Sequence, residues 1–266
     1  MSNATFFNEF ILLGFSEFQE LDLGFYIFLL LMYLLLLLGH SFIIIVVSIQ
    51  PKLHTPMYFF LLNFSIAEIS STTSEIPNML VNSFSGKNTI CFACCMAQGF
   101  VVFTMGVVEF ITLTIMSFDR YVAICKPLHY QTIMTSGLCI KLSLLSWIGG
   151  FGLIFPQSVV VWTYPYCGHN LIDHFFCDIG PVLQLACADT IVIELIGFLY
   201  GAAIMCDSFG FSLISYMHII NTILQIPSTI RRFKAFFTCA SHLIVLTIFC
   251  TADMLMYLKP STHGDT

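Results

Sequence analysis

Charged residues are scarce in this chain of 266 residues, which has only 9 Lys and Arg and 15 Asp and Glu. They make up 9% of the sequence, whereas they make up about a quarter of a soluble globular domain. Hydrophobic residues account for 58%, so too few polar side chains remain to cover the surface of a particle in water. The sequence therefore predicts an integral membrane protein surrounded by lipid.

Basic clusters, catalytic motifs and a cleavable leader are also missing. The formal net charge of -6 excludes nucleic acid as a partner, because proteins meet the phosphate backbone with basic patches. No nucleophile–base pair, metal motif or phosphate-binding loop is present, so we expect neither an enzyme nor a cofactor. Residues 1–24 contain no Lys or Arg, and the first apolar run would therefore act as an uncleaved signal anchor.

Six apolar runs are long enough to cross a bilayer as helices, which takes about 20 residues. We therefore expect an all-α membrane protein, with a transmembrane helix bundle at residues 25–258. The predicted spans are residues 25–49, 57–80, 91–122, 138–162, 191–224 and 235–258. They leave an N-terminal tail at 1–24, a long loop at 163–190 and a short tail at 259–266.

Positive charges indicate which side of the membrane each loop faces, because cytoplasmic loops are enriched in Lys and Arg. The first, third and fifth connections contain Lys52, Lys126, Arg231, Arg232 and Lys234. The sequence thus predicts that the N-terminal tail, the long loop and the short C-terminal tail are extracellular. The N-terminal tail includes Asn3, which begins an Asn-Ala-Thr sequon for N-glycosylation.

An acid, an arginine and a tyrosine follow one another at the predicted cytoplasmic end of the third span, at Asp119, Arg120 and Tyr121. Two interpretations of these residues alone are open. Arg120 could anchor the membrane edge by extending into the lipid headgroups. Alternatively, Asp119 and Arg120 could exchange partners between two states and act as a switch.

Two carboxylates lie inside predicted spans, Glu68 in the second and Glu109 in the third. Ionisable groups within a membrane are candidates for function, and these two could share a cation or a water cluster. They could equally be protonated and hydrogen-bonded in apolar surroundings. A small-solute or ion transporter using both residues is the alternative from another functional class, and the lack of repeat symmetry between spans counts against it.

The long loop contains Cys167, Cys177 and Cys187, with His169 and His174 between them. This pattern resembles a zinc site, but an extracellular location favours disulfides. Three loop cysteines leave one to pair elsewhere, and the outer end of the third span offers Cys91, Cys94 and Cys95.

Four of the other cysteines fall into two groups by their predicted position. Cys125 and Cys239 lie on the cytoplasmic side and should stay reduced. Cys206 and Cys250 are expected to be small buried hydrophobes.

Six motifs in order resemble those of the rhodopsin-like G-protein-coupled receptors and, more narrowly, of the olfactory (odorant) receptors. They are LHTPMYFF at 53–60, MSFDRYVAIC at 116–125, HFFCD at 174–178, LACADT at 185–190, SY at 215–216 and KAFFTCASHL at 234–243. The resemblance covers residues 1 to about 260. It implies a rhodopsin-like helix bundle in the plasma membrane that binds small organic odorants. It also implies coupling to the stimulatory olfactory-type G protein, which raises cyclic AMP through adenylyl cyclase.

The resemblance also implies roles for individual residues. Disulfides would join Cys95 to Cys177 and Cys167 to Cys187. Glu68 and Glu109 match interior acidic positions where a sodium ion can sit. The residues that match the G-protein switch and the elements that rearrange on activation are Asp119, Arg120, Tyr121, Tyr216 and the stretch 234–242.

Helical spacing indicates candidate ligand-binding residues on three spans. Those on the outer half of the third span are Val102, Phe103, Gly106, Val107 and Phe110; the others are Tyr200 and Ile204 on the fifth, and Cys250, Asp253, Met254 and Tyr257 on the sixth. Together they would form an apolar cavity with a few polar groups, although helix packing alone produces the same spacing. An ionised Asp253 would favour amines and hydrogen-bond donors.

Three features depart from the family pattern. His40 stands where the family has asparagine, and Cys250-Thr251 stands where an aromatic–glycine pair is expected. The chain also ends at Thr266, so six of the usual seven spans are present. The alternative within the receptors is therefore a truncated form that does not signal, is retained in the endoplasmic reticulum, or acts by pairing with a complete receptor.

Overall fold

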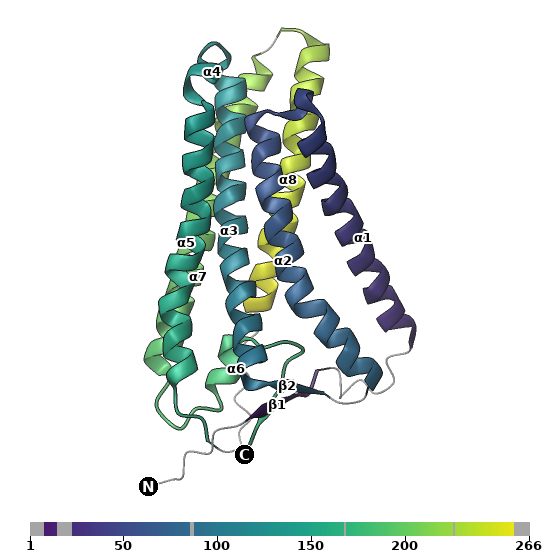
Figure 1. The fold of residues 1–266 in the computed structure, drawn as a ribbon. Helices are drawn as coiled ribbons and strands as arrows, with labels where there is room; N and C mark the ends of the chain where they lie inside the picture. Colours follow the sequence, from purple (N-terminus) through teal and green to yellow (C-terminus); the bar gives the residue numbers. More distant parts are fainter. Residues whose placement is uncertain (1–7, 15–22, 86–87, 168, 226, 258–266) are drawn as a thin grey trace.

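The computed structural model describes residues 8–14, 23–85, 88–167, 169–225 and 227–257. In these residues, six long helices form a bundle (Figure 1). They are α1 (Leu23–Ile49), α2 (Pro56–Ser85), α3 (Phe92–Cys125), α5 (Ser136–Thr163), α7 (Ile191–Leu224) and α8 (Thr229–Tyr257). The predicted spans lie on these helices. The helices extend up to six residues beyond the predicted spans, because they continue past the apolar segments of the sequence.

The two ends of the bundle carry different short elements. One end, here called the inner end, carries the 3-10 turns η2 (Pro51–Leu53) and η3 (Pro127–His129) and the helix α4 (Tyr130–Ile133). The opposite end, here called the outer end, carries the helix α6 (Ile179–Leu183) and the strands β1 (Glu9–Leu12), β2 (Thr89–Cys91) and β3 (Leu171–Ile172).

The surface of the bundle is apolar along much of its length. Four helices, α1 from Gly24, α3, α5 and α7, are long and apolar enough to cross a membrane. On α1, large side chains such as Leu35, Leu38 and Phe42 are more than half exposed. Water would penalise such a surface, whereas hydrocarbon would not.

Several hydroxyl groups on the helices donate to a carbonyl of their own helix. Thr112 donates to the carbonyl of Val108 at 2.7 Å, and Thr247 donates to the carbonyl of Leu243 at 2.7 Å. This i to i−4 pattern lets a polar side chain lie in an apolar environment without an unsatisfied donor.

Polar side chains also tie neighbouring helices together. The Oδ1 atom of Asn63 on α2 accepts hydrogen bonds from Ser143 at 2.7 Å and from the indole of Trp147 at 3.0 Å, both on α5. His40 on α1 shares a hydrogen bond of 3.0 Å with Ser65 on α2. His40, which departs from the family pattern, therefore still makes a polar contact between helices.

Helices α3 and α5 approach each other closely at Gly150. A Cβ atom at this position would lie 2.7 Å from the Cγ2 atom of Val108 and 2.9 Å from the carbonyl oxygen of Thr104. A residue without a side chain is therefore required for this close packing.

We expect Gly150→Ala to lower the free energy of unfolding by about 1–3 kcal/mol, because the added methyl group overpacks the α3–α5 contact. Thermal unfolding of the purified protein in detergent measures this change. Gly152→Ala on the same helix is the matched control, since its Cβ would meet nothing within 4 Å. Equal stability of the two variants would contradict this account of the contact.

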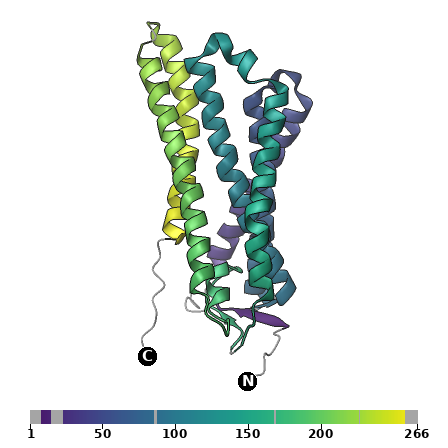
Figure 2. The same ribbon diagram turned by 90° about the vertical axis from the view of Figure 1, so that its left-hand side faces the viewer.

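A three-stranded sheet covers the outer end of the bundle (Figures 1 and 2). The central strand β1 pairs antiparallel with β2 and parallel with β3. Phe10 is fully buried and Leu12 is 3% exposed, so both contribute to the apolar core beneath the sheet. The sequence alone places these residues in an N-terminal tail, because a four-residue alternation is too short a signal for a strand.

Phe10→Ala should destabilise the protein by about 3–5 kcal/mol, the usual cost of removing a buried aromatic ring. Ile11→Ala, one position along the same strand at a half-buried residue, should cost clearly less. Thermal unfolding and the yield of folded protein report both effects. The sheet would be unimportant for stability if both substitutions had the same small effect.

Candidate functional site

The inner end of α3 carries a buried carboxylate with two donors. The side chain of Asp119 is fully buried and accepts from Arg120 through Nε at 3.1 Å and Nη2 at 2.5 Å. The hydroxyl of Tyr130 on α4 donates to the same carboxylate at 2.8 Å. A buried charge is tolerated only when it is paired and hydrogen-bonded in this way.

The surroundings keep Tyr130 in its donating form. Burial is the largest cause that raises the pKa of Tyr130, and the hydrogen bond to the negative Asp119 raises this pKa further. Tyr130 therefore remains protonated and joins the start of α4 to α3. The sequence alone does not indicate Tyr130, because this residue lies outside the apolar runs and reaches Asp119 only through the fold.

A second polar contact joins α7 to α8 at the same end. Tyr216 and Nδ1 of His242 share a hydrogen bond of 2.5 Å, and their rings stack with centroids 5.8 Å apart. Both side chains are buried, at 2% and 5% exposure. Among the described residues, the Nε2 atom of His242 has no hydrogen-bond partner.

Two further contacts join α3 to α7. Ser117 and Ser212 share a hydrogen bond of 2.9 Å, and the thiol of Cys125 lies 3.2 Å from the hydroxyl of Thr222. Asp119 and Arg120 therefore lie in a region where α3, α7 and α8 are linked by buried polar groups. An element with several exchangeable polar links can adopt two discrete arrangements.

Tyr216→Phe should lower the free energy of unfolding by about 1–3 kcal/mol, because it removes the partner of a buried imidazole. The change in thermal unfolding midpoint of the purified protein tests this. Tyr200→Phe is the control, since Tyr200 on α7 is 51% exposed. A Tyr216→Phe protein as stable as the wild type would show that the α7–α8 contact does not contribute to stability.

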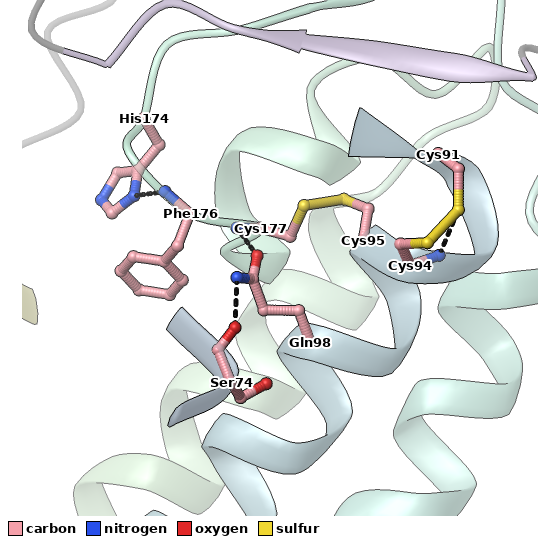
Figure 3. Close-up of a disulfide and its surroundings, with 8 residues drawn as sticks. All are labelled: Ser74, Cys91, Cys94, Cys95, Gln98, His174, Phe176 and Cys177. Atoms are coloured by element: carbon pink, nitrogen blue, oxygen red, sulfur yellow. Dashed lines mark hydrogen bonds between the residues drawn. A yellow bond between two sulfur atoms is a disulfide. The ribbon is translucent and has the colours of Figure 1, made fainter. Parts of the chain in front are cut away.

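Two disulfides shape the outer end. Cys95 on α3 is bonded to Cys177 with Cα atoms 5.3 Å apart, and Cys167 is bonded to Cys187 within the long loop. The structure thus brings together both pairs that the family resemblance implies. The first bond holds the loop against the outer end of α3 (Figure 3).

Gln98, which the sequence analysis missed, reinforces this attachment. Its Oε1 atom accepts from the backbone N–H of Cys177 at 3.0 Å, and its Nε2 atom donates to the carbonyl of Ser74 on α2 at 2.8 Å (Figure 3). The side chain is only 5% exposed, so one amide connects α2, α3 and the loop. The signal in the sequence is a single polar residue one turn after Cys95.

The alternative of a zinc site in the loop is wrong. Cys167 and Cys177 belong to different disulfides and therefore cannot act as thiolate ligands. The ring of His174 instead lies against Phe175 and Phe176, with centroids 4.8 and 4.6 Å away. Across the described residues, no group of three or more His, Cys, Asp or Glu is arranged to hold a metal ion.

The cysteines outside these pairs give one correction and one addition. Cys250 is buried, but Cys206 is exposed, so the expectation that both are buried is wrong for Cys206. Cys206 lies on a face of α7 that points away from the bundle. A thiol tolerates apolar surroundings both inside the bundle and on its outside. Cys91 and Cys94 form a third disulfide that the sequence analysis did not predict.

Three of the predicted ligand-binding residues meet inside the bundle. Phe110 on α3, Ile204 on α7 and Cys250 on α8 belong to one apolar cluster, which also includes Phe64 of α2. The ring of Phe249 on α8 lies with its centroid 5.0 Å from that of Phe110. Four helices thus contribute to a single apolar region.

The other predicted residues are less closely associated. On α3, Val107 is buried, and the half-buried residues are Val102, Phe103 and Gly106. Tyr200 is exposed at 51%. Asp253, Met254 and Tyr257 lie on α8, but their side chains are outside the described residues, as is all of Asn3.

Two of the cavities formed by the described residues lie near the outer end, and neither of these two is lined by a predicted ligand-binding residue. One, of about 20 Å³, lies between Gly99, Trp162 and Cys177. The other, of about 400 Å³, lies between α2, α3 and β2.

The two interior carboxylates lie on neighbouring helices. Glu109 on α3 is 3% exposed, and Glu68 on α2 is half-buried. The sodium site that the family resemblance implies at these two residues therefore stays a prediction.

Known proteins are similar in sequence to this chain along nearly its whole length. The model of a family described as "Olfactory receptor" matches residues 29–260. Human olfactory receptor 6X1 is 46% identical over 264 residues, which is 99% of this chain and 85% of that protein. Human olfactory receptor 2AP1 is 45% identical over 100% of this chain and 86% of its own length, and mouse olfactory receptor 6E1 is 44% identical over 99% and 84%.

The helix bundle, the buried polar links at its inner end and the loop disulfides therefore define a multi-pass membrane protein of the rhodopsin-like, G-protein-coupled class. The chain belongs to the olfactory receptor family. It is a receptor and not an enzyme.

Proposed function

We propose that this protein is an odorant receptor that binds small hydrophobic organic molecules inside the helix bundle and signals through a stimulatory olfactory-type G protein to adenylyl cyclase. The observation that carries the proposal is the meeting of Phe110, Ile204 and Cys250 in one apolar cluster. Residues chosen from helical spacing on three separate helices converge there.

The composition of this cluster supports apolar ligands. Its buried members are Phe64, Phe110, Leu113, Leu246 and Cys250, which offer dispersion contacts and few hydrogen bonds. Such a site recognises size and shape, and one methylene group is worth about 1–3 kcal/mol of discrimination. Its ligands would therefore be hydrophobic molecules of limited size.

The inner end supports coupling to a G protein. Asp119 and Arg120 form a pair within one helix, and Tyr130 is a further partner of the carboxylate. Breaking this arrangement would free Arg120 for a new contact, which is how a two-state polar network transmits a signal. Lys52 in η2 and Lys126 before η3 lie at this end, which supports a cytoplasmic inner end and an extracellular N-terminus for a receptor that we propose to lie in the plasma membrane.

Cyclic AMP measurements in cells that express the receptor, with a panel of small hydrophobic odorants, test the proposal. For an odorant that activates the wild type, Phe110→Ala should raise the half-maximal concentration by about tenfold or more, because it removes a ring from the proposed binding region. Phe198→Ala is the matched control, since Phe198 on α7 is 62% exposed. Labelling of the receptor at the cell surface corrects for expression.

Arg120→Ala separates signalling from binding in the same cells. It should abolish the rise in cyclic AMP while the receptor still reaches the surface. Odorant-evoked ion flux without cyclic AMP would instead support a transporter that uses Glu68 and Glu109. If Phe110→Ala reaches the surface and responds like the wild type, the ligand does not bind in this cluster.

A further inference from the structure

The larger cavity at the outer end lies where two helices separate. Figure 1 shows the outer half of α2 diverging from α3, with β2 across the end. Pro77 lies in this half of α2 and cannot donate the backbone hydrogen bond that would continue the helix regularly. The resulting cavity of about 400 Å³ has the volume of a small-molecule site, which is about 300–1,000 Å³.

Both cysteines of one disulfide line this cavity. Cys91 ends β2 and caps α3, and Cys94 lies in the first turn of α3 (Figure 3). Cys94 is exposed and Cys91 is half-buried. In contrast, Cys95 and Cys177 are only 1% and 3% exposed, so a reagent from solution reaches the first bond and not the second.

The Cys91–Cys94 bond joins only the end of β2 to the adjoining first turn of α3. Its cysteines are three residues apart, and β2 is already bound to β1 by backbone hydrogen bonds. Opening the bond therefore leaves the attachment of the loop through Cys95 unchanged. A disulfide that is accessible and structurally dispensable is available for exchange chemistry.

We propose that this cavity is a binding site for small thiols, which it captures by exchange with the Cys91–Cys94 disulfide. The thiolate of the ligand attacks the exposed sulfur of Cys94 and forms a mixed disulfide. The Cys91–Cys94 bond breaks, Cys91 leaves as a thiolate, and the proton of the ligand thiol goes to solvent. No net oxidant is needed, because one disulfide replaces another.

The local backbone favours this direction of attack. The backbone N–H of Cys94 donates to the sulfur of Cys91 at 3.0 Å, and this sulfur sits at the N-terminus of α3. Both features stabilise a thiolate on Cys91. The same thiolate can attack the mixed disulfide again, so capture is reversible.

The lining defines the class of thiol. Ser74, Asn78 and Gln98 provide neutral polar groups, and Ala97 and Val101 provide apolar surface. No charged side chain lines the cavity among the described residues. The site should therefore select compact, neutral thiols over charged ones such as glutathione.

Mass spectrometry of the purified, full-length protein in lipid nanodiscs tests the proposal. The protein is incubated with butanethiol, quenched in acid, alkylated and digested. We expect a butanethiol adduct on Cys94 and an alkylated Cys91. Because the butyl chain of the bound thiol is removed from water against Ala97 and Val101, the adduct on Cys94 should exceed that on the exposed Cys187 by about tenfold. Glutathione at the same concentration should label Cys94 far less.

Two alanines on α3 give a matched pair of variants. Ala97→Phe fills the cavity and should reduce labelling of Cys94 by about tenfold, because the butyl chain can no longer be buried there. Ala93→Phe, at an exposed alanine one turn earlier that does not line the cavity, should leave it unchanged. If Ala97→Phe fails to fold, competition of butanol with butanethiol on the wild type replaces it, and butanol should slow labelling.

The proposal is wrong if Cys94 and Cys187 are labelled equally, or if glutathione and butanethiol react alike, because either result indicates non-selective reduction. It is equally wrong if no adduct forms on Cys94, or if neither the filled cavity nor butanol affects labelling. Odorant-evoked cyclic AMP plays no part in these outcomes, so they stand apart from the receptor function proposed above.

Discussion

The bond between Cys95 and Cys177 determines the organisation of the outer end. It fixes the long loop to α3, and the loop then supplies β3, against which β1 pairs. The amide of Gln98 adds a link from the loop to α2. Without this attachment, β1 would lose its pairing with β3, and Phe10 would lose its edge contact with the ring of Tyr166. One covalent bond between distant parts of the chain thus places three elements that have little stability of their own.

At the inner end, the corresponding constraint is that a polar group inside the bundle is costly to leave without a partner. The carboxylate of Asp119 uses Arg120 and Tyr130, and Tyr216 uses His242. Each contact is worth only about 1 kcal/mol net, but leaving one group unpaired costs more. These contacts therefore specify how α3, α7 and α8 meet, while the apolar clusters supply most of the packing. A network of this kind can change its partners at modest cost, and this property suits a switch.

The sequence predicts the six helices well because long apolar runs are strong signals, and the family motifs identify the olfactory receptor family. It does not predict contacts that exist only after folding. Tyr130 lies 11 residues from Asp119 and Gln98 lies 79 residues from Cys177, so neither pairing has a local signature. The strand at Glu9–Leu12 is too short to show a period, and Cys206 shows that periodicity alone does not indicate which face of a lipid-exposed helix is buried. The predicted ligand-binding residues include a success and a failure of this kind. Phe110 and Ile204 meet in one apolar cluster, whereas Tyr200 is exposed.

Neighbouring cysteines on α3 show how position within a fold decides the role of a chemical group. Cys94 and Cys95 are adjacent, yet a helix turns about 100° per residue, so they face different surroundings. Cys95 points into the apolar core beneath the sheet, where its bond to Cys177 is shielded. Cys94 faces a cavity and is bonded within its own turn. The shielded disulfide can serve only as a structural link, because no thiol reaches it. The accessible disulfide links nothing that the fold requires, so its sulfur atoms remain available for chemistry with a ligand.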